Sequence, residues 1–306
     1  MTMIGADWTT NRRLEERRSS FRSSLWQIGM IIFLATAGSD MDVYGIIGNP
    51  VEHSLSPPMH EAAFRERGID AKYVTFEADP DRIEEAFRGA EALGVDGLTV
   101  TLPFKHDAFE FAEPDEQIQR VGAVNTIDFT ENGPVGYNTD MTGTLRAFEH
   151  HGVDLEDTRA VVVGAGGAAR ALAFGFEDAG ADVQIANRTA SKAHDLADEV
   201  PGATGHGLEA LPDLMADADV VANATSVGLE SDESVAPADA WHGDLVAFDA
   251  VYKPLETRFL KDAAATGAQT IDGAWMLLFQ GVDAFETWTG EDAPVETMNE
   301  VLRSHL

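Results

Sequence analysis

The sequence predicts an α/β protein of two domains, each built on a sheet covered by helices. Its 306 residues, 44% of them hydrophobic, with 28 glycines spread along the chain, are typical of one large or two ordinary globular domains. From Met41 onward, short β-rich runs alternate with amphipathic segments, which favours parallel α/β architecture. Near the middle of the chain a β-branched strand runs into a glycine-rich loop, where a second α/β unit begins.

The first unit is expected at 41–140. Each of its two early helices has a proline in the first turn and ends near a glycine, Gly68 or Gly94. Its predicted elements are a strand at 43–47, a helix at 57–67, a strand at 72–76, a helix at 80–93 and a strand at 97–101.

The second unit is expected at 141–273 and has the order of a nucleotide-binding domain. Its predicted elements are strands at 160–163, 182–187, 219–224, 245–251 and 270–272 and helices at 168–179, 190–200 and 256–266. Two further helices, at 274–287 and 295–305, are expected to pack back on the first unit.

The net charge excludes whole classes of partner. With 53 acidic against 21 basic residues it is −32, so a nucleic-acid surface is excluded because phosphate would be repelled. The bases are five lysines and sixteen arginines, and the acids are distributed along the chain, as in proteins of salt-loving organisms. We therefore expect a cytoplasm of high salt. The lack of cysteine excludes disulfides and thiolate sites, and no apolar run approaches a membrane span.

The first forty residues differ from the rest of the chain. Five arginines and four acids give them a charge of +1, whereas the remaining 266 residues carry −33. Basic residues before the apolar run 28–37 resemble a signal peptide, with Arg12-Arg13 as a twin-arginine pair. We prefer the alternative that residues 1–40 are a non-native or disordered extension.

The glycine loop predicts a dinucleotide site in a Rossmann-like domain. Its sequence is Gly164-Ala165-Gly166-Gly167-Ala168-Ala169, between a strand and an alanine-rich helix. The first glycine permits a tight turn, the second lets the backbone approach a pyrophosphate, and the helix N-terminus faces the phosphates. The alternative is a purely structural turn.

The end of the next strand favours NADP over NAD. Asn187, Arg188 and Thr189 occupy the place, about twenty residues after the loop, where NAD-specific sites need an acid for the ribose hydroxyl. An arginine there can bind a 2′-phosphate. Arg188 could instead be a solvated residue at the start of a helix.

Three polar clusters in the first unit predict a substrate site. Ser54 and Ser56 precede a helix, where a carboxylate is favoured, although Ser56 could simply cap that helix. Lys105 follows Thr101 and a proline turn, in a loop expected to face a cleft. Asn125 and Asp140 form the third cluster, and Asp140 could be a plain helix cap.

Later motifs complete a resemblance to the shikimate dehydrogenase family over about 43–306. These motifs are Asn223-Ala-Thr225-Ser226-Val-Gly228, Asp249-Ala-Val-Tyr252 and Gly273-Ala-Trp-Met276-Leu-Leu-Phe-Gln280. The resemblance implies a substrate domain of 41–140 with 274–306, an NADP domain of 141–273, and reversible NADPH-dependent reduction of 3-dehydroshikimate to shikimate in chorismate and aromatic amino-acid biosynthesis.

The resemblance also implies residue roles. Lys105 and Asp140 would transfer the proton. Ser54, Ser56 and Tyr252 would lie near the substrate carboxylate, and Thr101, Asn125, Asp140 and Gln280 at ring hydroxyls. The cofactor would be bound by Gly164, Ala165, Gly166, Gly167, Ala168, Asn187, Arg188, Thr189 and Thr225, with Gly273 and Met276 near the nicotinamide.

The chain departs from the family pattern at two positions, where Thr99 and Glu61 replace a common Asn. Thr99 keeps a hydroxyl but lacks an amide, so its role stays open. The same chemistry needs no family argument at Lys105, because ketone reduction requires a proton donor at the carbonyl oxygen.

Alternative interpretations are a quinate/shikimate dehydrogenase that uses NAD, and a dinucleotide-binding regulatory module without catalysis. No metal site is expected, since most of the nine histidines are isolated. A small-molecule substrate is the expected partner, and monomer and homodimer stay open.

Overall fold

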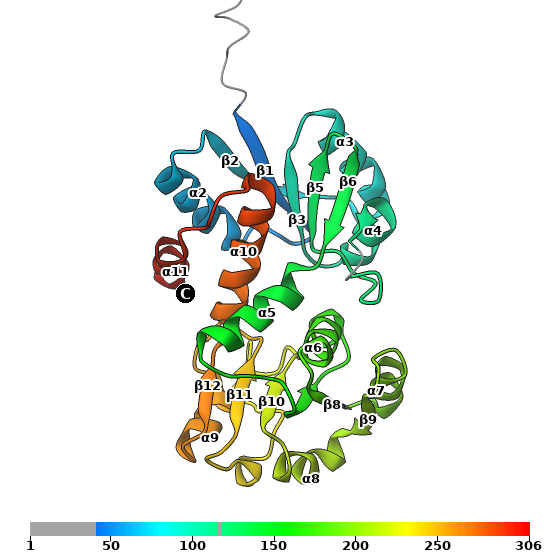
Figure 1. Ribbon diagram of the computed structural model, residues 1–306, viewed down its shortest axis with the longest axis vertical. Coiled ribbons are helices and arrows are strands. Elements are labelled where there is room, and N and C mark those ends of the chain that lie inside the picture. The colour runs from blue at the N-terminus through cyan, green and yellow to red at the C-terminus, as the bar shows by residue number, and fades with distance from the viewer. Residues whose placement is uncertain (1–40, 116–117) are drawn as a thin grey trace, which may run out of the picture. The chain divides into compact units, whose positions relative to one another are not determined.

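Two six-stranded sheets organise the part of the chain that the structure describes (Figure 1). The computed structural model describes residues 41–115 and 118–306. The extension and signal-peptide interpretations concern residues 1–40 and lie outside the described residues.

The first sheet has the order β2-β1-β3-β5-β6-β4. Its strands are β1 (Asp42–Gly48), β2 (Ala71–Glu77), β3 (Gly97–Val100), β4 (Glu113–Pro114), β5 (Thr126–Thr130) and β6 (Gly133–Tyr137). β1 is parallel to β2 and β3, but β5 runs antiparallel to both β3 and β6.

The two α/β sheets are confirmed, but the first sheet is mixed, with an antiparallel hairpin beside its parallel strands. The hairpin of β5 and β6 was missed because Gly133, Pro134 and Gly136 are residue types that strands disfavour. Gly133 begins β6 opposite Thr130, across a turn at Glu131 and Asn132, and its φ of +116° is a conformation that favours glycine.

Seven helical segments belong with this sheet. They are α2 (Ser56–Arg67), the 3₁₀ turn η1 (Pro80–Arg82) continuing into α3 (Ile83–Ala92), α4 (Lys105–Phe111), α5 (Thr139–His150), α10 (Gly273–Thr289) and α11 (Val295–Ser304). α2 has Pro57 in its first turn and ends at Gly68, as predicted. α4 was not predicted, because its seven residues are too few for a clear periodicity, so Lys105 begins a helix instead of lying in a loop.

The second sheet is parallel throughout, with the order β12-β11-β10-β7-β8-β9. Its strands are β7 (Arg159–Val163), β8 (Asp182–Asn187), β9 (Thr204–Gly207), β10 (Val220–Asn223), β11 (Val246–Asp249) and β12 (Gln269–Ile271). Its helical segments are α6 (Gly167–Asp178), α7 (Ala190–Ala197), η2 (Leu208–Ala210), α8 (Leu211–Ala216), η3 (Ala238–Ala240) and α9 (Arg258–Ala265). β9 and α8 were missed, since the Thr-Gly-His-Gly of β9 lacks branched apolar residues.

The chain order reverses in this sheet between β7 and β10, which is where such sheets bind ligands. Gly164 follows β7 at that point with a φ of +133°, a conformation that side chains disfavour. A Cβ on Gly164 would lie 2.9 Å from the carbonyl oxygen of Ala224, so this turn requires glycine.

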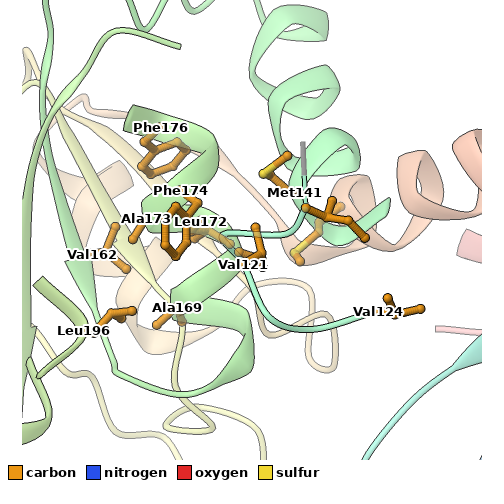
Figure 2. Packing of buried hydrophobic residues seen from close by; sticks show 14 of the residues in the cluster. Val121, Val124, Met141, Val162, Ala169, Leu172, Ala173, Phe174, Phe176 and Leu196 are labelled. Carbon is orange, nitrogen blue, oxygen red and sulfur yellow. The ribbon is translucent and has the colours of Figure 1, made fainter. Parts of the chain in front are cut away.

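Buried side chains connect the first sheet's loops to α6. Figure 2 shows Val121 in one cluster with Leu172, Phe174 and Phe176 of α6. Arg170 of the same helix donates hydrogen bonds to the carbonyl oxygens of Arg120 and Val121. The segment that leads to Asn125 is thereby attached to the helix that follows the glycine loop.

Helices α5 and α10 pack side by side (Figure 1). A Cβ on Gly143 of α5 would lie 2.5 Å from the backbone nitrogen of Gln280 in α10. Only glycine allows this approach, which fixes the position of Gln280. The described residues contain no helix that is both long and apolar enough to cross a bilayer.

Candidate active site

A pocket of about 350 Å³ opens at the carboxyl ends of β1 and β3. It brings together every residue predicted to bind or transform the substrate: Ser54, Ser56, Thr101, Lys105, Asn125, Asp140, Tyr252 and Gln280. Three of the predicted cofactor residues, Ala168, Gly273 and Met276, also line it. Parallel strands leave a crevice beyond their carboxyl ends, so residues that are far apart along the chain meet there.

Lys105 and Asp140 form an ion pair in this pocket. Lys105 is the first residue of α4 and Asp140 the second of α5, and the Nζ–Oδ2 distance is 2.5 Å. The side chains are 24% and 14% exposed. A charge-assisted hydrogen bond in such a partly buried setting orients the ammonium group firmly.

Asn125 positions the start of α5, and with it Asp140. Its Oδ1 accepts from the backbone N–H of Thr139 at 2.7 Å, and its Nδ2 donates to the Thr139 hydroxyl at 3.1 Å. The N-cap of α5 is Asn138, whose Oδ1 accepts from Met141 N–H. The interpretation of Asp140 as a plain cap is therefore wrong, and its carboxylate is available to Lys105.

The two serines occupy a turn at the start of α2. Ser54 Oγ accepts from the Ser56 N–H at 3.2 Å, and Ser56 is the first residue of the helix. The N-cap is Leu55, which offers no side-chain oxygen, so the prediction of Ser56 as a cap is wrong. Both serines lie where the helix dipole favours an anion.

Tyr252 and Gln280 complete the polar lining. Burial raises the pKa of Tyr252, which keeps its hydroxyl protonated as a donor. Gln280 is buried on α10, with its amide nitrogen donating to the Leu277 carbonyl at 2.9 Å. That bond leaves the amide oxygen of Gln280 as the acceptor for a ligand.

Asp249 is a functional candidate to which the sequence assigned no role. It is fully buried at the end of β11 and accepts hydrogen bonds from the Asn223 amide, the Val251 N–H and the Thr257 hydroxyl. Burial raises its pKa to about 6, against those three hydrogen bonds. Asp249 thereby ties together the loops that carry Thr225 and Tyr252.

The remaining predicted cofactor residues lie outside this pocket. They are Gly164, Ala165, Gly166, Gly167, Asn187, Arg188, Thr189 and Thr225. A Cβ on Gly166 or Gly167 would meet nothing within 4 Å, so the backbone at the start of α6 is open to a ligand. The first N–H groups of a helix have no partner within the helix and favour phosphate.

Arg188 is exposed at the carboxyl end of β8, and in the described ranges no hydrogen bond or ion pair engages its guanidinium. Asn187 closes the same turn by donating to the Thr189 carbonyl at 3.0 Å. The donor set therefore fits a phosphorylated ribose.

Residues that the sequence did not single out also line the pocket: Ile46, Pro50, Val51, Val100, Ala250 and Leu277. Within residues 41–115 and 118–306, no three His, Asp or Glu side chains are grouped for a metal ion.

The fold and the pocket define a class of protein: a dinucleotide-dependent oxidoreductase with a lysine and carboxylate pair at its substrate site. Family profiles agree with this class. The shikimate dehydrogenase substrate binding domain matches 46–127, shikimate / quinate 5-dehydrogenase matches 146–233, and the shikimate 5′-dehydrogenase C-terminal domain matches 273–303.

Individual relatives are more specific. The chain is 63% identical to the shikimate dehydrogenase (NADP(+)) of Haloarcula marismortui and 62% identical to that of Natronomonas pharaonis, over 87% of this chain and 100% of each relative. The Thermus thermophilus shikimate 5-dehydrogenase, solved with NADP(H) and shikimate, superposes with a TM-score of 0.81 at 36% identity, over 87% of this chain and 100% of that one. The Corynebacterium glutamicum quinate dehydrogenase with NAD gives 0.81 at 32%, over 86% and 99%. The chain belongs to the shikimate dehydrogenase family.

Proposed function

We propose that this chain is an NADP-dependent shikimate dehydrogenase, which reversibly reduces 3-dehydroshikimate to shikimate on the route to chorismate. The observation that carries the proposal is the Lys105–Asp140 ion pair inside a pocket of hydroxyl and amide groups. The curated relatives at 60–63% identity have the same activity in their names.

Substrate binding follows from the lining. Ser54, Ser56 and Tyr252 supply hydroxyl donors for a carboxylate near the start of α2, where the helix dipole favours an anion. Asn125, Thr101 and Gln280 bind ring hydroxyls. The pocket thus holds an anion without an arginine among its lining residues, in a strongly acidic protein.

Proton transfer falls to Lys105. NADPH, when bound, supplies the hydride for the carbonyl carbon. As negative charge develops on the carbonyl oxygen, the Lys105 ammonium donates its proton there, and Asp140 holds the Lys105 side chain in position. In the oxidation of shikimate, the neutral Lys105 amine accepts the hydroxyl proton.

Cofactor choice depends on the open start of α6 and on Arg188. Gly166, Gly167 and Ala168 would hold the pyrophosphate against the helix N-terminus, while Arg188 grips the 2′-phosphate from the exposed end of β8. Asn187, Thr189 and Thr225 support these loops, and Gly273 and Met276 border the nicotinamide.

We also assign residues 41–140 and 274–306 to the substrate domain and residues 141–273 to the cofactor domain. The packing of α11 on α2 and of α10 on β5 supports the return of the last helices to the first sheet. The acidic composition and the haloarchaeal relatives support function in a salt-rich cytoplasm.

Steady-state kinetics in molar KCl, with shikimate and quinate crossed against NADP and NAD, test the proposal. The expected result is the highest kcat/KM for shikimate with NADP, and its loss in Lys105→Ala excludes a contaminating enzyme. A preference for quinate with NAD would assign the chain to the quinate branch of the family. Nucleotide binding without turnover of either substrate would identify a regulatory module.

A further inference from the structure

A buried tyrosine outside the pocket contacts a residue that lines it. Tyr73 lies on β2 and is 4% exposed, and its hydroxyl donates to the Thr99 hydroxyl at 2.9 Å. Thr99 on β3 lines the pocket, whereas Tyr73 does not.

Sheet register explains how the Tyr73 side chain reaches Thr99. Tyr73 pairs with Tyr44 of β1, and Thr99 pairs with Ile46 two positions further along the same strand. Residues two apart on a strand point to the same face, so Tyr73 and Thr99 share the face covered by α2. The length of the phenol spans the offset between the two positions.

The environment holds the phenol in one orientation. The His60 ring of α2 stacks on Tyr73, with ring centroids 4.5 Å apart and planes 3° from parallel. His60 is fully buried, and its ring nitrogens have no hydrogen-bond partner within the described ranges. Burial lowers the pKa of His60 to about 3, so the stacked ring is neutral. It acts as a flat apolar wall and does not compete for the Tyr73 proton.

The two departures from the family pattern both contact Tyr73. The Thr99 hydroxyl accepts a hydrogen bond from the Tyr73 hydroxyl, and Glu61 Oε1 accepts one from the Tyr73 backbone N–H at 3.2 Å. Glu61 also pairs with Lys72 at 3.3 Å, which attaches α2 to β2. These replacements therefore form one connected arrangement around a single side chain.

We propose that Tyr73 is a positioning residue for the substrate, which acts through Thr99. A threonine hydroxyl has one proton to donate and two lone pairs. Because Tyr73 occupies a lone pair of Thr99, the Thr99 proton is directed toward another acceptor, and the pocket offers a hydroxyl oxygen of the bound substrate. Tyr73 thus orients the hydroxyl of Thr99 as a donor, at a position where the family pattern commonly has the longer side chain of Asn.

The inference rests on the proposed function, and Tyr73→Phe tests it. Without the Tyr73 hydroxyl, the Thr99 proton is no longer directed toward the substrate, so the hydrogen bond from Thr99 to shikimate is weakened. This should lower kcat/KM for shikimate about 2- to 10-fold, through a higher KM. We expect kcat, the KM for NADP and the melting temperature to change little by comparison. A merely structural role would lower stability without this selective rise in the shikimate KM.

Tyr44→Phe is the matched control. Tyr44 is buried in the same apolar cluster and does not line the pocket, so its variant removes a phenol hydroxyl without touching Thr99. Its shikimate KM should equal that of the wild type. An equal rise in both variants, or none in Tyr73→Phe, would overturn the inference.

A double-mutant cycle shows whether Tyr73 acts through Thr99. Thr99→Val should raise the shikimate KM, Thr99→Ser should not, and Tyr73→Phe/Thr99→Val should resemble Thr99→Val alone. If the increases in the shikimate KM of the two single variants multiply in the double variant, the inference is contradicted. If Tyr73→Phe does not fold, the Val and Ser variants of Thr99 decide, and equal KM values in both would overturn it. Wild-type protein without shikimate turnover would overturn the proposed function as well, and is thus distinguishable from failure at Tyr73 alone.

Discussion

At the scale of single residues, variants of the ion pair between Lys105 and Asp140 distinguish a role in catalysis from a role in substrate binding. Each residue lies in the first turn of a helix, and Asn125 holds the start of the second helix in place. The two side chains are already in contact, so the proposed proton donor is preorganised before substrate binds.

Lys105→Ala should lower kcat by about 10²-fold or more, the scale of general acid–base catalysis, while the shikimate KM changes much less. Asp140→Asn should also lower kcat. Because the two act as one unit, the double variant should be little worse than the worse single one. Fluorescence titration should show NADP binding intact in all three. Near-normal turnover of Lys105→Ala would make this lysine a binding residue only.

Arg188 is the residue proposed to favour NADP over NAD. Arg188→Ala should raise the KM for NADP far more than that for NAD, because only NADP has a 2′-phosphate for a guanidinium to bind. Initial rates with each cofactor at saturating shikimate measure this. Lys192→Ala, four residues further along the chain on α7, serves as the control for a general loss of positive charge. Equal effects on both cofactors in Arg188→Ala would contradict the assignment.

At the scale of elements, Asp249 joins the ends of β10 and β11. Its three hydrogen bonds fix the loops that lead to Thr225 and Tyr252. Thr225 is proposed to bind the cofactor and Tyr252 the substrate. The folded-state pKa of Asp249, about 6, is above the usual 3.8, so the folded protein binds more protons than the unfolded chain between these values. The contribution of Asp249 to stability is therefore complete at low pH and decreases as pH rises through about 6.

Asp249→Asn should reveal this dependence, since asparagine does not titrate. Relative to wild type, the variant should gain about 2 kcal/mol of stability on going from pH 4.5 to pH 8, because pH 4.5 lies roughly 1.5 units below the folded-state pKa and one unit corresponds to about 1.4 kcal/mol. Thermal unfolding of both proteins in molar KCl measures the difference. Taking the difference between the proteins removes the titration of the other carboxylates. A difference that is constant with pH would show that Asp249 does not titrate in this range.

At the scale of the whole molecule, charge is the dominant feature. Only 16 basic residues accompany 49 acidic ones after position 40, so the acids cannot each have a basic partner. Many of the bases that the structure describes form local ion pairs, such as Arg146 with Asp283 and Glu286 between α5 and α10. Water and salt ions have to compensate for the remaining negative charge.

Melting temperature and activity should therefore rise from about 0.1 M to about 2 M KCl, because the Debye length falls to about 3 Å near 1 M and repulsion is screened. Scanning fluorimetry and shikimate oxidation across the series measure both. A parallel series in sucrose, which stabilises without screening charge, is the control. A flat response to KCl would mean that the acidity has another cause.

The sequence alone determined the class of fold, the glycine loop and most of the polar residues that line the pocket. Strong periodicity and proline and glycine signals located β1, α2 and β8 closely, since these features are local. Elements with weak local signals were missed, namely the β5–β6 hairpin, β9, α4 and α8. Short segments of glycine, proline and polar residues become regular only when neighbouring strands and helices complete their hydrogen bonds.

Only the tertiary structure decided which polar groups share a proton or a hydrogen bond. Lys105 and Asp140 are 35 residues apart, Asn223 and Asp249 26 apart, and Tyr73 and Thr99 26 apart. No local pattern specifies such pairs, because the register between strands and the close crossing of helices at Gly143 bring them together. The sequence could therefore name the residues proposed to transfer the proton, while packing determined that Asn138 caps α5, that Asp249 is buried, and that Tyr73 contacts the pocket residue Thr99.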